Sequence, residues 1–214
     1  AAASRRFPSY LAPAMTQLPE LPLTLSRQEI RKMIRQRRRA LTPEQQQEMG
    51  QQAATRMMTY PPVVMAHTVA VFLSFDGELD TQPLIEQLWR AGKRVYLPVL
   101  HPFSAGNLLF LNYHPQSELV MNKLKIHEPK LDVRDVLPLS RLDVLITPLV
   151  AFDEYGQRLG MGGGFYDRTL QNWQHYKMQP VGYAHDCQLV EKLPVEEWDI
   201  PLPAVVTPSK VWEW

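Results

Sequence analysis

The stretch Arg158-Leu159-Gly160-Met161-Gly162-Gly163-Gly164-Phe165-Tyr166-Asp167 places four of the chain's 10 glycines within five consecutive residues. An apolar run over residues 142–152 precedes it, and a helix is predicted from Tyr166 to about Trp173. A strand, a glycine loop and a helix start present backbone N–H groups to an anion, and Arg158 adds a full positive charge. Glycine also lets a phosphate approach without meeting a Cβ. The stretch predicts a phosphate-binding loop, although a turn without a ligand would fit the same spacing.

This loop matches neither of the common nucleotide-binding loops. A Walker A loop needs a lysine followed by serine or threonine after its last glycine, and the stretch contains neither. The dinucleotide fingerprint G-x-G-x-x-G, started at Gly160, would place its third glycine at Phe165. The stretch therefore indicates a phosphate without indicating a known nucleotide fold.

Composition limits the class of protein. The 214 residues, of which 45% are hydrophobic, suit one compact domain, predicted over residues 26–214. A net charge of +1 argues against a general affinity for nucleic acid or anionic membranes, and no apolar run is long enough to span a bilayer. The single cysteine, Cys187, excludes an internal disulfide and fits a reducing, cytoplasmic compartment. Four prolines and no apolar periodicity predict that residues 1–25 are a disordered extension.

Helical and strand patterns alternate along the rest of the chain. The predicted helices cover residues 26–40, 42–58, 81–91 and 166–173, and the predicted strands cover residues 69–73, 95–100, 108–113, 143–146, 181–184 and 204–207. Residues 69–100 read as a β-α-β unit with parallel strands, and residues 108–113 as an antiparallel edge strand. This alternation predicts an α/β protein, a three-layer α/β/α sandwich with a mostly parallel sheet.

The first predicted helix carries a row of arginines. Arg27, Arg31, Arg35 and Arg38 follow steps of four, four and three residues, so they share one helix face. Such a row is either a solvated basic face or a set of cations for a polyphosphate or a polyanionic tail. The local sequence leaves both interpretations open.

Three acidic residues are candidates for a site at the carboxyl ends of the strands, where ligands bind in open α/β sheets. Glu78, after the predicted strand 69–73, could accept hydrogen bonds from an amidine-like N–H edge, or it could be an exposed loop acid. Asp167 could be a magnesium ligand or a helix cap, and Asp199 could be a second carboxylate or a structural one.

One long run of the sequence resembles the signature of a known enzyme family. The run DEYGQRLGMGGGFYDR, residues 153–168, closely resembles the signature of the 5-formyltetrahydrofolate cyclo-ligases, also called methenyltetrahydrofolate synthetases. Residues 72–78, 144–148 and 194–200 and the basic N-terminal helix support the resemblance, which extends from about residue 26 to the end. It implies a fold similar to the sugar-phosphate isomerase and CoA-transferase group. It also implies ATP as co-substrate and Mg²⁺ as cofactor.

The resemblance implies the conversion of 5-formyltetrahydrofolate to 5,10-methenyltetrahydrofolate with release of ADP and phosphate. The γ-phosphoryl group of ATP is transferred to the formyl oxygen, which gives an iminium phosphate. N10 then attacks the formyl carbon and phosphate leaves. Such a reaction needs positioning and charge neutralisation more than an acid or a base.

The resemblance assigns roles position by position. Those that match ATP-binding positions are Arg27, Arg31, Arg158, Leu159, Gly160, Met161, Gly162, Gly163, Gly164, Phe165 and Tyr166. Those that match folate-binding positions are Leu73, Glu78, Met161 and Phe165, and those associated with magnesium are Asp167 and Asp199.

Four positions depart from the usual family residues. Arg27 is often lysine in the family, Met161 is often arginine or lysine, Gly163 is sometimes basic, and Phe165 is often tyrosine. A lost charge-assisted hydrogen bond is worth roughly 1.5–3 kcal/mol, so either nearby arginines compensate or nucleotide binding is weaker.

Two other functions stay open from the sequence. One is an isomerase or acyl-transfer enzyme that acts on a phosphorylated small molecule without ATP, although the loop lacks the expected lysine. The other is a nucleic-acid-binding module that uses the Arg27–Arg39 helix, which the net charge of +1 argues against. The same arginines could instead attract the polyglutamate tail of a folate. We expect neither a nucleic acid nor a membrane as partner.

Overall fold

The computed structural model describes residues 25–214, so the predicted disordered extension lies, apart from Leu25, outside the described residues. Within this range seven strands form one sheet, whose five inner strands are parallel and whose two edge strands are antiparallel. In spatial order they are β12 (Val211–Glu213), β11 (Ala204–Val206), β9 (Gln179–Tyr183), β6 (Val144–Thr147), β1 (Thr68–Ala70), β2 (Arg94–Leu100) and β3 (Leu108–Tyr113). The predicted α/β class with a mostly parallel sheet is confirmed, as is the antiparallel edge strand β3.

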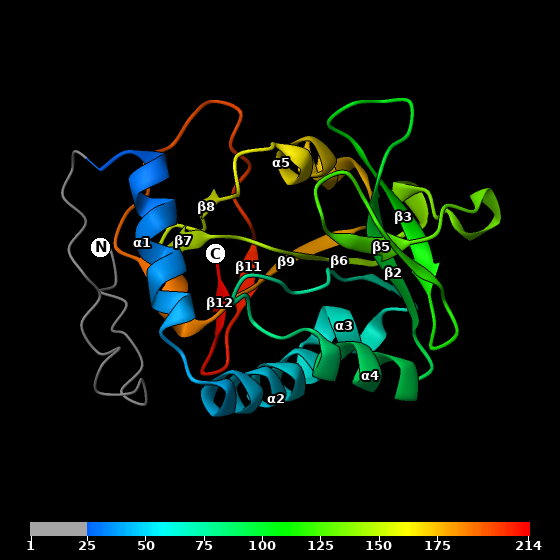
Figure 1. Cartoon of the computed structure of the whole chain (residues 1–214), viewed down its shortest axis with the longest axis horizontal. Coiled ribbons are helices and arrows are strands. Elements are labelled where there is room, and N and C mark those ends of the chain that lie inside the picture. The colour runs from blue at the N-terminus through cyan, green and yellow to red at the C-terminus, as the bar shows by residue number, and fades with distance from the viewer. Residues whose placement is uncertain (1–24) are drawn as a thin grey trace.

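Helices and a small second sheet cover the two faces of the large sheet (Figure 1). The elements on one face are α2 (Pro43–Thr59), α3 (Pro61–Met65) and α4 (Gln82–Arg90). Those toward the other face are α5 (Phe165–Leu170) and the strands β7 (Ala151–Asp153), β8 (Arg158–Leu159) and β10 (Leu189–Val190). Separate clusters of buried apolar side chains fill the two interfaces, because each inner strand is apolar on both faces.

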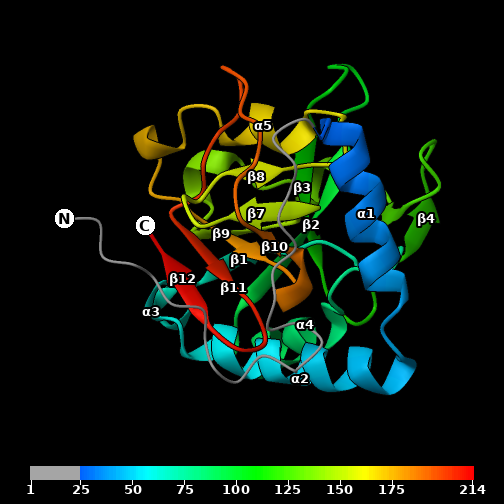
Figure 2. The same ribbon diagram turned by 90° about the vertical axis from the view of Figure 1, so that its left-hand side faces the viewer.

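Helix α1 (Arg27–Arg39) lies across one end of the molecule, beside β7, β8 and β10 (Figure 2). It begins with a capping box: Ser26 Oγ accepts from Glu29 N at 3.1 Å, and Glu29 Oε1 accepts from Ser26 N at 3.4 Å. Ile30 and Ile34 are fully buried in a cluster with residues of the small sheet. This packing turns the basic face of α1 toward the loops at the sheet edge.

Two predicted elements differ from the observed ones. The strand predicted over residues 69–73 ends at Ala70. Its neighbour β6 pairs only with Val69 and Ala70, and the chain continues as a loop after Ala70. The helix predicted over residues 166–173 ends at Leu170, because Asn172 adopts a left-handed conformation with φ 60° and a 3₁₀ turn follows.

The short hairpin of β4 (Leu119–Met121) and β5 (His127–Pro129) and the sheet β10-β7-β8 were not predicted. The glycine loop consequently follows β8, a strand of the small sheet, and not a strand of the large sheet. None of the helices between residues 25 and 214 combines the length and the apolar content that crossing a bilayer requires.

Candidate active site

A pocket of about 510 Å³ lies where the glycine loop meets the ends of the inner strands. The loop after β1 and the glycine loop both line it, although the first follows a strand of the large sheet and the second follows β8 of the small sheet. The predicted site residues in its lining are Arg27, Arg31, Leu73, Glu78, Arg158, Gly160, Met161, Gly162, Gly163, Gly164, Phe165, Tyr166 and Asp167. Two predicted residues lie outside the lining: Leu159 packs in the apolar cluster beneath α1, and Asp199 is buried behind Arg27.

The glycine loop has a backbone that side chains would disrupt. Gly162 and Gly164 have φ of +106° and +71°, in the region that favours glycine. A Cβ on Gly163 would lie only 2.8 Å from the ring of Phe165. The family's occasional basic residue at this position is therefore incompatible with this arrangement of Phe165.

Arg31 reaches from α1 to the glycine loop. Its Nε donates to the Gly160 carbonyl at 2.7 Å, and its guanidinium would lie within 3.6–3.7 Å of a Cβ on Gly162. Arg31 therefore brings a cation to the loop from another element, although Met161 and Gly163 carry no charge. Burial, followed by the neighbouring Arg27 and Arg35, lowers the pKa of Arg31, and Asp199 opposes this.

Arg158 and Asp167, predicted for different roles, are in contact. Arg158 is only 6% exposed; its Nε donates to the Pro148 carbonyl at 2.9 Å and its Nη1 lies 3.4 Å from Asp167 Oδ1. The guanidinium also lies over the ring of Tyr166, 5.7 Å from its centre, at cation–π distance. Arg158 therefore orients both side chains that open helix α5.

Tyr166 lines the pocket and carries a donor that no described protein group uses. Its hydroxyl is buried and has no hydrogen-bond partner among residues 25–214. Burial raises the pKa of Tyr166 far above neutrality, so the hydroxyl keeps its proton. A buried hydroxyl without a partner is costly, so a ligand that accepts its hydrogen bond would gain from the contact.

Glu78 combines a fixed position with a shifted pKa. Its Oε1 accepts from Phe75 N at 3.0 Å, which folds the side chain back over its own loop. Burial raises the pKa of Glu78 to about 7, while the Phe75 N–H and Arg38 lower it and Asp76 raises it further. The carboxyl therefore changes charge near neutral pH.

We predict that kcat/KM for the pocket's substrate rises with pH through an acid limb near pH 7 and that Glu78→Gln removes this limb. The protonated acid, like glutamine, cannot accept a charge-assisted hydrogen bond. Losing such a bond lowers kcat/KM above the limb by roughly 10- to 100-fold. The matched control is Glu118→Gln, an exposed acid paired with Lys130, which keeps the limb. A limb that persists in Glu78→Gln would assign it to another group.

Asp199 is engaged by protein groups. Arg27 donates to both of its oxygens, at 2.7 and 3.1 Å, and Glu196 N donates to Oδ2 at 2.8 Å. No cluster of three or more histidine, cysteine or acidic side chains suited to a metal occurs in residues 25–214. Of the two predicted metal ligands, Asp167 lines the pocket and Asp199 does not.

One wall of the pocket was missed by sequence reasoning. It comes from the β4–β5 hairpin and from the loop before β11, namely Asn122, Leu124, Ile126, His127, Glu128 and Trp198. Glu128 Oε2 accepts from Leu100 N at 3.1 Å and from Asn122 Nδ2 at 3.0 Å. No local sequence motif marks the hairpin residues, since the hairpin's long-range packing against β2 and β3 brings them to the pocket. Trp198 lies within the stretch 194–200 that supports the family resemblance, but its place in the pocket was not predicted.

Comparisons with known proteins place the chain among relatives of one family. The model of the 5-formyltetrahydrofolate cyclo-ligase family matches residues 24–208. A 5-formyltetrahydrofolate cyclo-ligase of Escherichia coli (strain K12) is 99% identical over 182 residues, covering 85% of this chain and all of the relative. The enzyme of the same name from Haemophilus influenzae is 53% identical over 179 residues, covering 84% of this chain and 96% of the relative.

Solved structures show the same fold. The 5,10-methenyltetrahydrofolate synthetase of Aquifex aeolicus matches with a TM-score of 0.75 and 28% identity, over 88% of this chain and 93% of the other. The 5,10-methenyltetrahydrofolate synthetase of Mycoplasma pneumoniae matches with a TM-score of 0.68 and 21% identity, over 86% and 99% of the two chains, and this likeness concerns the fold alone.

Proposed function

The chain belongs to the 5-formyltetrahydrofolate cyclo-ligase family and is a ligase that converts 5-formyltetrahydrofolate to 5,10-methenyltetrahydrofolate; we propose that it does so in the pocket between α1 and Glu78, with ATP as co-substrate. The observation that carries the proposal is the arrangement of this pocket. Cations and a bare glycine backbone line one part of it, and apolar side chains with carboxylates line another.

The polyphosphate of ATP binds at the glycine loop. Arg31 and Arg158 supply charge there, and the positive-φ glycines leave the backbone accessible to phosphate oxygens. Arg27 reaches the same end of the pocket when it releases Asp199. Arg31 compensates for the missing cation at Met161, because it is anchored to Gly160 while the rest of its guanidinium remains at the loop.

The folate binds along the apolar part of the pocket. Leu73, Met161 and Phe165 contact its ring system, and the Glu78 carboxylate accepts hydrogen bonds from ring N–H groups. A ring stacked on Phe165 is held without the hydroxyl that a tyrosine would add. The apolar lining also excludes water from the phosphorylated intermediate.

The chemistry proceeds in two balanced steps. The formyl oxygen attacks the γ-phosphorus of ATP; the new O–P bond forms as the bond to the β-phosphate oxygen breaks, and ADP leaves. The N10 lone pair then attacks the formyl carbon, N10 loses its proton, and the C–O bond breaks with release of phosphate. Arg31 and Arg158 neutralise the charge of the transferred phosphoryl group, and the pocket aligns oxygen and phosphorus.

Asp167 fits a role as magnesium ligand. It lines the pocket and is largely buried, its Oδ1 contacts Arg158, and magnesium takes one or two carboxylates together with substrate phosphates. Asp199 fits only after Arg27 leaves it, because both its oxygens accept hydrogen bonds from Arg27. Magnesium held by Asp167 would supply positive charge that offsets the charge of the ATP phosphates.

The alternative functions gain little support from the contacts of α1. Its arginines contact protein acceptors rather than forming a free basic face; these are Arg27, Arg31, Arg35, Arg37, Arg38 and Arg39. This disfavours nucleic-acid binding, and a polyglutamate tail would have to compete with these contacts. The pocket has one part lined by cations and another lined by apolar side chains and carboxylates. Two such parts favour a ligase that binds two substrates, ATP and a folate, over an isomerase that acts without ATP. The single thiol of Cys187 suits a reducing cytoplasm.

Near-ultraviolet absorbance tests the proposal. The methenyl product has a conjugated amidinium that the substrate lacks, so a new band reports ring closure. The protein incubated with 5-formyltetrahydrofolate should produce this band with Mg-ATP and not without it. A band that grows equally without nucleotide would support the ATP-independent alternative, and no band under either condition would contradict the proposal.

A further inference from the structure

The loop that carries Glu78 has a conformation that needs external support. Asp76 and Gly77 both have positive φ, of 52° and 77°, and this is unfavourable for Asp76. The Gly77 carbonyl accepts a hydrogen bond from Gln46 Nε2 at 3.1 Å and lies 3.2 Å from His185 Nε2. A Cβ on Gly77 would lie 3.2 Å from Arg38 Cβ. The loop is thus pressed against the C-terminal end of α1.

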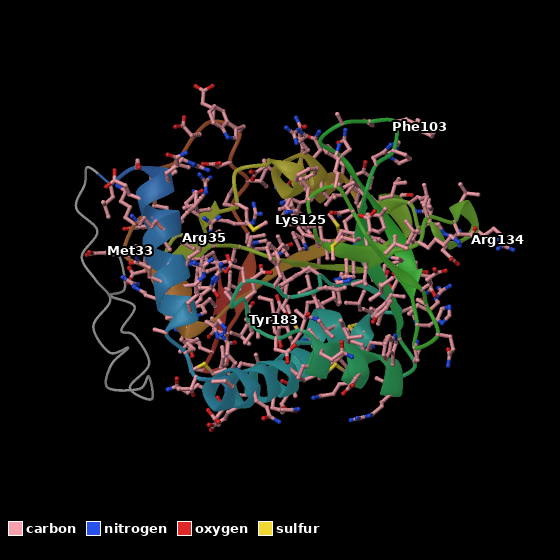
Figure 3. All side chains as sticks on the ribbon, in the orientation of Figure 1. Met33, Arg35, Phe103, Lys125, Arg134 and Tyr183 are labelled. Carbon is pink, nitrogen blue, oxygen red and sulfur yellow. The ribbon has the colours of Figure 1, made fainter. Side chains whose placement is uncertain are left out.

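Three arginines of α1 converge on the single carboxylate of Asp76. Arg39 donates to Oδ1 at 2.8 and 2.6 Å, Arg35 Nε lies 3.8 Å from Oδ2, and Arg38 Nη2 lies 3.9 Å from Oδ2. Figure 3 shows Arg35 on the side of α1 that faces the rest of the chain. Arg39 is largely exposed and Arg35 is partly exposed, whereas Arg38 is 1% exposed.

The burial of Arg38 requires an explanation. Its Nε and Nη1 have no hydrogen-bond partner within the described part of the chain, and its contact to Asp76 is long. An arginine keeps its charge when buried, so it needs nearby negative charge. Burial lowers the pKa of Arg38, and Glu78, followed by Asp76, opposes this. Glu78 is therefore an electrostatic partner of Arg38 as well as a pocket residue.

We infer that Arg38 is a positioning residue for Glu78: its buried guanidinium lies against Asp76 and Gly77 and so fixes the loop that presents the Glu78 carboxylate to the folate. The inference rests on the proposed role of Glu78 as the folate-binding acid. Nothing in the first helix distinguishes Arg38 from its neighbours by sequence, since all of them are arginines in an amphipathic row.

The charged and titratable groups around Glu78 are Asp76 of its own loop, Arg38 of α1, Tyr166 of α5 and His185 of the segment after β9. Burial lowers the pKa of His185 to about 4, so the ring is neutral and its Nε2–H donates to Gly77. Burial keeps the Tyr166 hydroxyl protonated. A shift of the acid limb therefore reports Glu78.

The test is the pH dependence of kcat/KM for 5-formyltetrahydrofolate between about pH 5.5 and about pH 9, with an enzyme-free blank at each pH. Arg38→Met should move the acid limb to higher pH by about one unit, because the cation that favours the carboxylate is gone. Below the limb kcat/KM should fall by roughly tenfold, and at high pH it should approach the wild-type value. The KM for ATP should not change, and Arg38→Lys should restore the wild-type limb.

Two further variants separate charge from loop support. Arg39→Met removes the shorter contacts to the same Asp76 without removing the charge next to Glu78, so it should keep the wild-type limb. Asp76→Asn removes the anion that raises the pKa of Glu78, so its limb should move to lower pH. The acid limb should therefore move to higher pH in Arg38→Met and to lower pH in Asp76→Asn. A general loosening of the loop would not move the limb in opposite directions in the two variants.

An unchanged limb in a folded Arg38→Met, or the same shift in Arg39→Met as in Arg38→Met, would overturn the inference. If Arg38→Met does not fold, as its melting curve would reveal, an unchanged limb in Asp76→Asn is sufficient to overturn it. Ring closure by the wild-type protein is measured in the same series. Its absence would contradict the proposed function, which is a different result from a limb that fails to move.

Discussion

Asp167→Asn should lower kcat for ring closure by at least about 100-fold. Its proposed role is that of a direct magnesium ligand, and loss of such a ligand should cost more than the roughly 10- to 100-fold lost with outer-shell groups. The same change should cost only about 1–2 kcal/mol of unfolding free energy. Asparagine keeps an oxygen for Arg158 Nη1, and the existing contact of 3.4 Å is already long. Activity should thus fall far more than stability.

The measurement pairs steady-state kinetics with urea denaturation of the same preparations. Asp132→Asn provides the control, since this carboxylate is partnered with the exposed Arg134 and does not line the pocket. A higher Mg²⁺ concentration should partly restore Asp167→Asn and have no effect on the control. Equal losses of activity and stability in Asp167→Asn would mean that the residue supports Arg158 and has no role at the phosphates.

Arg31→Met should raise the KM for ATP by roughly 10- to 100-fold while the KM for the folate changes little. Arg31 is the side chain that reaches from α1 across the glycine loop, where Met161 and Gly163 provide no charge. Its removal takes away a charge-assisted contact to phosphate, together with the hydrogen bond to Gly160. Mg-ATP should raise the melting temperature of the wild-type protein and have a much smaller effect on Arg31→Met.

Arg56→Met is the control for Arg31→Met. Arg56 Nε donates a hydrogen bond to the Pro208 carbonyl, and Arg56 does not line the pocket. Its replacement should leave the KM for ATP and the KM for the folate unchanged. If Arg31→Met binds ATP as tightly as the wild type, the loop backbone and Arg158 alone hold the phosphates. The double variant Arg31→Met/Met161→Arg asks whether a cation on the loop itself restores the affinity.

The order of elements could be predicted from the sequence because their patterns are local. The capping box of Ser26 and Glu29 and the apolar run at residues 69–73 each identify an element without reference to the rest of the chain. The end of β1 at Ala70 could not be predicted, because it depends on which residues of β6 face it. The end of α5 depends on a left-handed residue, Asn172, whose conformation is set by the following turn.

The candidate site also contains parts that could be predicted from the sequence and parts that could not. The glycine loop and Glu78 were both predicted as site residues from local sequence, and both line the pocket, but the small-sheet strand β8 that leads into the glycine loop was not predicted. The contact of Arg158 with Asp167 was not, since it requires the loop to fold back on the start of α5. The wall contributed by β4 and β5 is separated from the glycine loop by many residues and has no motif of its own. Long-range packing of this hairpin on β2 decides its position.

The transfer of the formyl oxygen to phosphate is the chemical step on which the account depends. It is tested by 5-formyltetrahydrofolate labelled with ¹⁸O in the formyl group, incubated with the protein and Mg-ATP, followed by ³¹P spectroscopy of the products. The account predicts that the released phosphate carries the label while ADP does not. Label released into water, with unlabelled phosphate, would contradict phosphorylation of the formyl oxygen and with it the roles given to Arg31, Arg158 and the glycine loop.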